Sequence, residues 1–306
     1  MPYLFAHFKE KITPDGEAVY FGKSRDGFNW EKVNNGNPVL MSSLGEKGCR
    51  DIEIIRLHTG GFAIITTDLC VANRYDENLN LDWKNINSHG SKSLCIWKTP
   101  DLVNFSEQKL QNFGRDDFGC MWAPEVFFDE KNEEYLIHWG STIKEDNYTH
   151  MSIYCSVTKD FESFSEPKLF FTKENEILDS HITKTGDTYH LFYKNSSNPP
   201  MNMHATADNL YGPYAHDSAF EEYMDKEIQN PGSYEGPTTY TLPDGRWCLM
   251  LDFFGCEKEK MGYVPFVSNA PGDSNFTRMT EGFSFPYGFK HGKVIEITEE
   301  EFNRLL

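Results

Sequence analysis

Five residues that can take part in proton transfer recur along the chain at nearly regular intervals. They are Asp51, Glu125, Asp179, Glu235 and His291, separated by 74, 54, 56 and 56 residues. Each lies near the start of a segment with the pattern of a β-strand, so a repeated fold would gather them in one place. Repulsion and partial burial would raise some carboxyl pKa values and leave others low. Hydrolysis of a glycosidic bond needs one protonated and one ionised carboxyl.

The stretch around Glu235 could hold a carboxyl group still. Gly236 permits an unusual backbone conformation and Pro237 fixes its own φ, immediately ahead of a β-rich run. A general acid must be held in place in this way. On its own, Glu-Gly-Pro is more typical of an ordinary turn. The other acidic strand starts favour a catalytic interpretation over one in which each acid merely caps a loop.

The elements that must position these residues form an internal repeat. A short strand, then an aspartate, then an aromatic residue occurs five times. The aspartate and aromatic pairs are Asp26 with Trp30, Asp101 with Phe105, Asp160 with Phe164, Asp208 with Tyr214, and Asp273 with Phe276.

Two further strands precede four of these copies, and polar turns join them as in β-hairpins. The innermost strands are expected at 51–55, 122–128, 179–182 and 235–240, and the second strands at 61–65, 134–138, 188–192 and 246–250. Helical periodicity is nearly absent, apart from a short turn at 298–302.

Units of three or four strands, spaced by about 55 residues, are typical of propeller blades. The fifth unit is split, because its third-strand motif opens the chain and the segment 291–297 closes it. Pairing both termini in one blade avoids exposed sheet edges. The sequence therefore predicts an all-β protein, a single five-bladed β-propeller domain over residues 1–306.

Composition narrows the partners and the compartment. The net charge of −18 argues against nucleic acid and anionic membranes, and no run of about 18 apolar residues could span a bilayer. The first nine residues lack the features of a signal peptide. Seven scattered cysteines contain no Cys-x-x-Cys pair. We therefore expect a cytoplasmic protein that acts on a small oligosaccharide.

The motifs together resemble glycoside hydrolase family 43, the five-bladed inverting arabinofuranosidases and xylosidases. The resemblance rests on Arg50-Asp51, Trp122-Ala-Pro-Glu125, the strand with Asp179, and Glu235-Gly-Pro, in this order. It implies that Asp51 is the general base, that Glu235 is the general acid, and that Asp179 tunes the pKa of that acid. The family commonly has Asp-Pro at both aspartates, whereas Ile52 and Ser180 follow them here. Losing proline frees the backbone, so the aim of either aspartate is open.

Other residues are candidates for contacting the sugar. They are Trp122, Glu125, His181, Phe253 and His291. Trp122 offers a face to a sugar ring or packs in the core, and Glu125 accepts from a sugar hydroxyl or belongs to a polar network. His291 resembles the central histidine of the family, which implies calcium or water at the channel centre; a core histidine is the alternative. No cofactor is expected to be required.

The resulting hypothesis is an inverting exo-glycosidase that releases a pentose, α-L-arabinofuranose, from plant-type oligosaccharides. A β-xylosidase of the same family and a non-catalytic sugar-binding propeller are the alternatives. A retaining fructan hydrolase is disfavoured, because its Asn-Asp-Pro-Asn-Gly and Glu-Cys signatures are missing.

Overall fold

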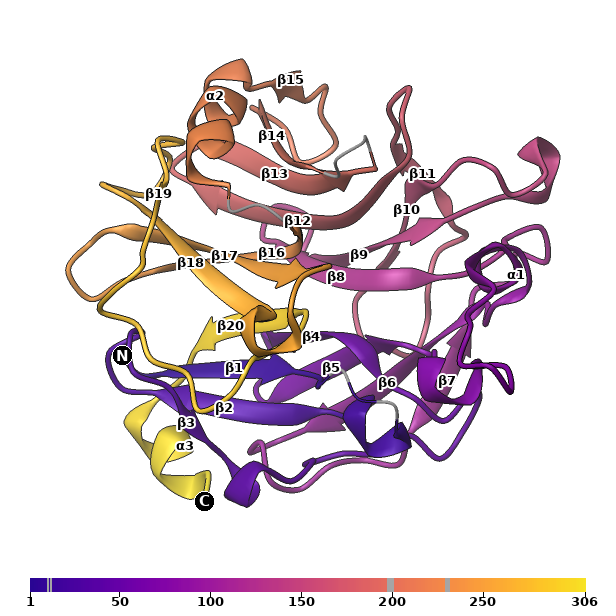
Figure 1. Ribbon diagram of the computed structural model, residues 1–306, viewed down its shortest axis with the longest axis horizontal. Helices are drawn as coiled ribbons and strands as arrows, with labels where there is room; N and C mark the ends of the chain where they lie inside the picture. Colours follow the sequence, from indigo (N-terminus) through magenta and orange to yellow (C-terminus); the bar gives the residue numbers. More distant parts are fainter. Residues whose placement is uncertain (10, 12, 197–200, 229–231) are drawn as a thin grey trace.

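The strands of the chain form five four-stranded units arranged around a centre (Figure 1). The structure is a computed structural model that describes residues 1–9, 11, 13–196, 201–228 and 232–306. Three of the units are separate sheets, and the other two share an eight-stranded sheet. These two meet at a single parallel pairing of Gly292 with Ile52, so we count them as separate blades.

Each of the first four blades is an antiparallel meander of consecutive strands. Blade 1 consists of β4 (Arg50–Arg56), β5 (Phe62–Thr67), β6 (Ser93–Thr99) and β7 (Lys109–Asn112). Blade 2 consists of β8 (Trp122–Asp129), β9 (Glu134–Ser141), β10 (Ser152–Thr158) and β11 (Lys168–Phe171). Blade 3 consists of β12 (Ile177–Thr185), β13 (Thr188–Asn195), β14 (Met201–Ala207) and β15 (Ala215–His216). Blade 4 consists of β16 (Ser233–Thr241), β17 (Trp247–Phe254), β18 (Gly262–Ser268) and β19 (Thr277–Arg278).

The two ends of the chain build the fifth blade together. It consists of β20 (Gly292–Glu296), β1 (Tyr3–His7), β2 (Tyr20–Ser24) and β3 (Glu31–Lys32). Strand β20 pairs with β1, and Figure 1 shows the last strand beside the first. The inner strands β4, β8, β12, β16 and β20 contact one another in this order, and β20 contacts β4. The predicted five-bladed propeller with a shared terminal blade is therefore confirmed.

The repeated aspartate begins a tight turn after the third strand of each of three blades. The Oδ1 atoms of Asp26, Asp101 and Asp160 each accept two backbone N–H groups, two and three residues further on. The residue after the aspartate has a positive φ in each case: Gly27 at 74°, Leu102 at 66° and Phe161 at 58°. This local chemistry explains why the motif marks the outer turn of a blade.

The propeller contains more helix than the sequence predicts. The expected turn near residue 300 is the helix α3 (Glu299–Arg304), which begins at a capping box on Thr298. Two helices contradict the expectation of almost no helix: α1 (Trp83–His89) and α2 (Ser218–Glu227). Each begins where an aspartate, Asp82 or Asp217, accepts backbone N–H groups of the first turn. None of the described helices is long and apolar enough to cross a membrane.

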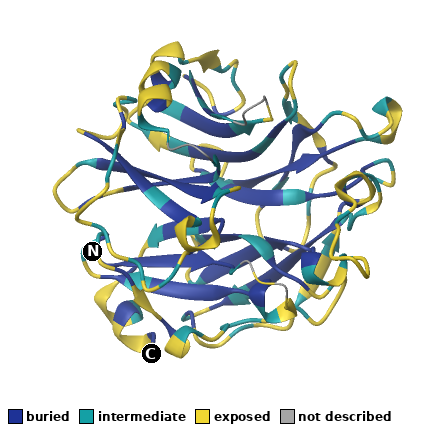
Figure 2. Ribbon diagram, in the orientation of Figure 1, coloured by how far each residue is buried: buried dark blue, intermediate teal, exposed yellow. Residues whose placement is uncertain are grey.

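Apolar side chains fill the spaces between adjacent blades. Phe21 and Ile54 belong to one cluster between blades 5 and 1, and Ile65 and Trp139 to another between blades 1 and 2. Figure 2 shows this burial along the strands, with exposed residues in loops and on helix faces. The packed blades leave the inner strands as a stable support for polar side chains at the centre.

Candidate active site

The inner strands of the first four blades share a β-bulge near their beginnings. The strand pairing shifts register between Arg50 and Glu53 in blade 1, and blades 2 to 4 show the same shift. One residue in each bulge has a left-handed backbone: Asp51 (φ 52°), Ala123 (48°), Asp179 (52°) and Gly236 (56°). Such bulges re-aim side chains next to functional sites. These four positions are therefore equivalent around the ring.

The bulge shows how Asp51 and Asp179 are aimed although no proline follows either aspartate. Asp51 and Asp179 have the same left-handed backbone as Ala123 and Gly236, both of which precede proline. The N–H of Ile52, which proline would lack, donates to the His291 carbonyl at 3.4 Å. The two aspartates thus keep the common bulge geometry without a following proline.

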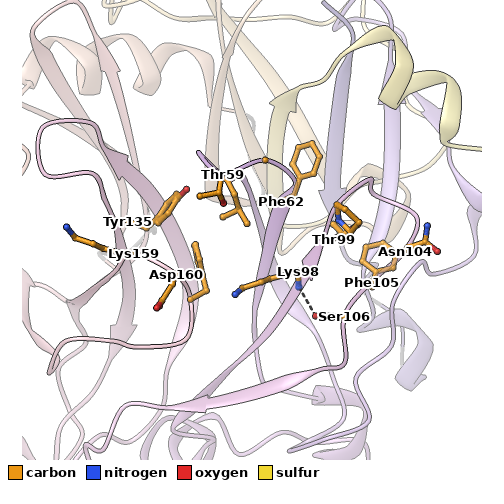
Figure 3. Close-up of a pocket in the computed structure, with 14 residues that line it drawn as sticks. Thr59, Phe62, Lys98, Thr99, Asn104, Phe105, Ser106, Tyr135, Lys159 and Asp160 are labelled. Atoms are coloured by element: carbon orange, nitrogen blue, oxygen red, sulfur yellow. Dashed lines mark hydrogen bonds between the residues drawn. The ribbon is translucent and has the colours of Figure 1, made fainter.

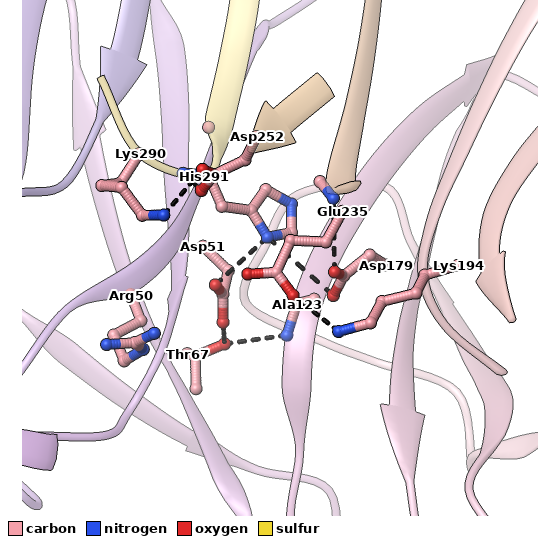
Figure 4. Close-up of polar contacts among 12 residues, drawn as sticks. Arg50, Asp51, Thr67, Ala123, Asp179, Lys194, Glu235, Asp252, Lys290 and His291 are labelled. Carbon is pink, nitrogen blue, oxygen red and sulfur yellow. Dashed lines mark hydrogen bonds and ion pairs between the residues drawn. The ribbon is translucent and has the colours of Figure 1, made fainter. Parts of the chain in front are cut away.

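Four ionisable side chains converge at the beginnings of the inner strands. Asp51, Asp179, Glu235 and His291, which we call the pocket layer, line one cavity of about 460 Å³ (Figure 4). His291 Nδ1 lies 3.2 Å from Asp51 Oδ1 and 3.9 Å from Asp179 Oδ1. Gly236 allows this approach, because a Cβ there would lie 2.7 Å from the His291 ring. The predicted catalytic trio is therefore gathered in one place.

Asp51 is held as a carboxylate by two neighbours. Its Oδ2 accepts from Thr67 Oγ1 at 2.7 Å, and Thr67 in turn accepts from the Ala123 N–H at 2.8 Å. Burial raises the pKa of Asp51, but the hydrogen bond and charge of His291 outweigh it and hold the pKa at about 2. Asp51 is therefore ionised throughout the usual pH range, as a general base must be.

His291 is placed to donate a hydrogen bond to Asp51. Burial lowers its pKa, but Asp179 and Asp51 outweigh burial and raise the pKa to about 10. The ring is then a cation beside the Asp51 carboxylate. The described residues contain no group of three or more His, Cys, Asp or Glu side chains arranged to hold a metal ion. Calcium or water at the channel centre beside His291 stays a prediction.

Asp179 and Glu235 form a coupled pair. Burial raises the pKa of Asp179 to about 6, with Glu235 adding repulsion. Burial also raises the pKa of Glu235, but the charges of Lys194 and Lys290 outweigh it and keep that pKa below its usual value. Lys194 Nζ lies 2.6 Å from Glu235 Oε2. The two carboxyls therefore lose their last shared proton as one unit.

A second set of charges lies two residues further along the inner strands. Glu53, Glu125, His181 and Lys293, which we call the channel layer, are all buried or nearly so. Lys293 Nζ lies 2.9 Å from Glu125 Oε2 and 3.3 Å from Glu53 Oε2. His181 Nδ1 lies 2.8 Å from Glu125 Oε2, and its Nε2 lies 2.9 Å from Thr239 Oγ1.

The channel layer corrects the expected convergence of all five recurring residues. Glu125 and His181 follow the bulge by two residues, whereas Asp51 and Asp179 lie within it. Neither Glu125 nor His181 lines the pocket of about 460 Å³. Glu125 is a member of a polar network, one of the two roles considered for it, and does not face a sugar in the pocket.

Of the two aromatic residues expected to contact the sugar, one lines the pocket and the other does not. Trp122 lines the pocket, as expected. Phe253 does not, because it is buried and stacks on Tyr234 with ring centroids 4.7 Å apart. Its neighbour Phe254 lines the pocket instead, since successive residues of a strand point to opposite faces.

Several pocket residues have no signal in the sequence pattern. Lys194 lies on a second strand, and helix α1 supplies Trp83 and Asn87. The ring of Trp83 meets that of Trp122 edge to face, with centroids 6.1 Å apart. The buried Asn87 Oδ1 has no hydrogen-bond partner among the described residues. Outside the strand repeat, the sequence does contain a helix-start signal here, because an acidic stretch and then Asp82 come before Trp83.

A different cavity, of about 600 Å³, lies between blades 1 and 2 (Figure 3). Thr59, Lys98 and Tyr135 are among the residues that line it. Asp160 is the one carboxylate among its described lining residues, and it accepts the backbone N–H groups of its own turn. This cavity therefore lacks the paired carboxyls that the pocket layer provides.

Comparison with known proteins agrees with this geometry. A family model described as a probable glycosyl hydrolase domain, of the type related to family 43, matches residues 1–303. The chain belongs to the glycoside hydrolase 43-related family. An α-L-arabinofuranosidase of Bifidobacterium longum is 25% identical over 207 residues, which cover 61% of this chain and 19% of that protein. The chain thus matches about a fifth of the length of that relative.

Solved structures of family-43 glycoside hydrolases share the fold. A thermostable family-43 enzyme superposes with a TM-score of 0.54 at 16% identity, covering 81% of this chain and 77% of that one. An endo-1,4-β-xylanase from Bacteroides thetaiotaomicron superposes with a TM-score of 0.58 at 14% identity, covering 92% and 91%. At these identities the likeness concerns the propeller fold alone.

Proposed function

We propose that this family member is an inverting exo-glycosidase that releases α-L-arabinofuranose from oligosaccharides. The observation that carries the proposal is the contrast within the pocket layer. Asp51 is held ionised, with a pKa of about 2, while burial and the charge of Glu235 raise the pKa of Asp179 to about 6. One ionised and one protonated carboxyl facing a single pocket are what glycoside hydrolysis needs.

The proposed reaction is a single displacement. Asp51 takes a proton from a water molecule, whose oxygen attacks the anomeric carbon as the glycosidic bond breaks. Glu235 gives its proton to the departing oxygen, and the sugar leaves with inverted configuration. Thr67 and His291 keep Asp51 aimed, through their contacts at 2.7 and 3.2 Å. Asp179 shares its proton with Glu235.

The substrate proposal rests on the relative and on the shape of the site. The relative in Bifidobacterium longum is an α-L-arabinofuranosidase. The cavity of about 460 Å³ is near the small end of ligand pockets, roughly 300–1,000 Å³, which suits a chain end. Trp122 and Trp83 offer apolar faces for sugar rings, and Asn87 Oδ1 can accept from a hydroxyl.

Two measurements on the whole chain test the proposal. Nitrophenyl arabinofuranoside, xyloside and galactoside are screened for release of nitrophenol, and proton NMR identifies the first anomer formed from the best substrate. Preference for the arabinofuranoside with inversion is the expected result. Preference for the xyloside would favour a β-xylosidase instead. Sugar binding by calorimetry without turnover of any substrate would leave only the sugar-binding propeller.

A further inference from the structure

Lys194 approaches the carboxyl pair from outside the ring of inner strands. It lies on β13, the second strand of blade 3, and its side chain is 13% exposed. Its Nζ lies 2.6 Å from Glu235 Oε2 and 4.8 Å from the centroid of the Phe254 ring. The ammonium therefore contacts both the Phe254 ring and the Glu235 carboxylate, and Figure 4 shows the ion pair.

This contact opposes the role proposed for Glu235. A general acid must carry a proton, whereas a cation at hydrogen-bond distance stabilises the carboxylate. Lys194 remains charged, because Glu235 and Asp179 outweigh its burial and raise its pKa. Forming such a short, largely buried ion pair costs desolvation energy. A role in positioning Glu235 therefore explains the ion pair better than a contribution to stability alone.

Other charges around Glu235 must be weighed with Lys194. The charges of Lys290 and His291, ahead of β20, and of Asp179 on β12 act together with Glu235. Asp51 on β4 lines the same pocket, Asp252 on β17 is the cross-strand partner of Glu235, and the Tyr263 hydroxyl on β18 donates to the Gly236 carbonyl. Lys290 is bonded to Asp252 at 2.7 Å and His291 to Asp51 at 3.2 Å. Lys194 differs from these two cations, because its short contact is to Glu235 itself.

We propose that Lys194 is a positioning residue that fixes the orientation of the Glu235 carboxyl and sets the upper pH limit for proton donation by the Asp179 and Glu235 pair. The inference rests on the proposed function, since it assigns the limit to a proton used in glycoside hydrolysis. Activity then disappears as pH rises through the pKa of the pair. Removing the positive charge raises that pKa, so the alkaline limb of the profile moves to higher pH.

The kinetic test compares kcat/KM against pH for the wild type, Lys194→Met, Lys194→Arg and Lys184→Met. Lys184 is an exposed lysine on β12, so its loss changes the net charge equally. In Lys194→Met we expect the alkaline limb to rise by roughly one unit, while kcat at the optimum falls about tenfold or more because the acid loses its anchor. Lys194→Arg and Lys184→Met keep the wild-type limb. The position of a limb does not depend on how much protein is folded.

A second readout separates this inference from the proposed function. Carboxyl carbon-13 NMR, with Glu235→Gln to assign the signal, follows the titration of Glu235 without any substrate. A higher midpoint in Lys194→Met than in the wild type supports the inference, even if no glycoside is hydrolysed. An active wild type whose limb and NMR midpoint are both unmoved in Lys194→Met overturns it and leaves the proposed function standing.

Discussion

The pocket layer and the channel layer are built from similar residues, which lie on the inner strands or, for His291, just ahead of one. Each has two or three carboxyls, one histidine and a lysine close by. In the channel layer Lys293 lies between Glu53 and Glu125, so the charges are compensated within the layer. In the pocket layer Asp51 and Glu235 face the cavity of about 460 Å³, whereas Glu53, His181 and Lys293 line a different cavity of about 770 Å³.

This difference shows that residue type alone does not determine whether a carboxyl joins the buried network or faces the candidate catalytic pocket. The position relative to the bulge decides it. A left-handed residue at Asp51 or Asp179 turns the carboxyl towards the cavity, whereas Glu53 and Glu125, two residues later, face their neighbours in the channel. The variants below separate the two layers.

Removing one proton-transfer group from the pocket layer gives the largest expected effect. Glu235→Gln and Asp51→Asn should each lower kcat by roughly 10²–10⁴-fold, because general acid or base assistance is lost. The measurement is kcat on an oligosaccharide substrate, with circular dichroism to check the fold.

The matched control is Glu125→Gln, which makes the same chemical change in the channel layer. We expect its main effect to be a lower free energy of unfolding, with a smaller effect on kcat per folded molecule. Near-normal kcat in Glu235→Gln, or a kcat loss in Glu125→Gln as large as in Glu235→Gln, would remove the functional distinction between the layers.

Lys293→Met should have the largest effect on stability. It leaves Glu53 and Glu125 close together and buried without their shared cation. Breaking a buried pair in this way costs about 3–5 kcal/mol of unfolding free energy. Urea denaturation measures the loss, and Lys184→Met is the exposed control. A loss below about 1 kcal/mol would mean that the channel layer is open enough for water to replace the lysine.

The fold was predictable because its signals are local. Asp26, Asp101 and Asp160 complete their turns with neighbouring backbone groups, so the repeat shows in the sequence itself. Closure by the two ends followed from counting these motifs and from the need to avoid sheet edges. The predicted trio of Asp51, Asp179 and Glu235 does meet in one pocket.

The rest of the site depends on packing between blades. In blade 2 the position equivalent to Asp51 and Asp179 is Ala123, and Glu125 lies two residues later, an offset that the approximate spacing of the repeats does not reveal. Thr67 and Lys194 lie on second strands, and each contacts the inner strand of the next blade, at the Ala123 N–H and at Glu235. Helix α1 is short and only Ile86 within it is buried, so it has no apolar periodicity to detect. Contacts across blades decided these positions.

The dependence of kcat/KM on pH tests the comparison further, because only the pocket layer is expected to determine it. The base is active once Asp51 loses its proton, above about pH 2, and the acid is active only while the pair of Asp179 and Glu235 retains a proton. The value of kcat/KM should therefore fall about tenfold per pH unit once that proton is lost. Asp179→Asn removes the repulsion that retains the proton, so its alkaline limb moves to lower pH. An unmoved limb would mean that Asp179 only positions the sugar.

Trp83→Ala should give the smallest effect, confined to substrates with a second sugar ring. Trp83 is 46% exposed at the pocket, and its ring lies edge to face with the ring of Trp122. A stacked ring is worth about 0.5–1.5 kcal/mol, so KM for an arabino-oligosaccharide should rise roughly two- to tenfold. A methyl arabinofuranoside has no second ring, and its kcat/KM should stay within about twofold.

The control for the helix itself is Lys84→Ala, an exposed position of α1 that does not line the pocket. If Trp83→Ala weakens both substrates equally, α1 only shields the pocket layer from water. If Lys84→Ala weakens the oligosaccharide as much as Trp83→Ala does, the effect belongs to the stability of α1 and not to the indole. Loss on the oligosaccharide alone, in Trp83→Ala alone, places the second sugar against this helix, on the side of the pocket away from the channel layer.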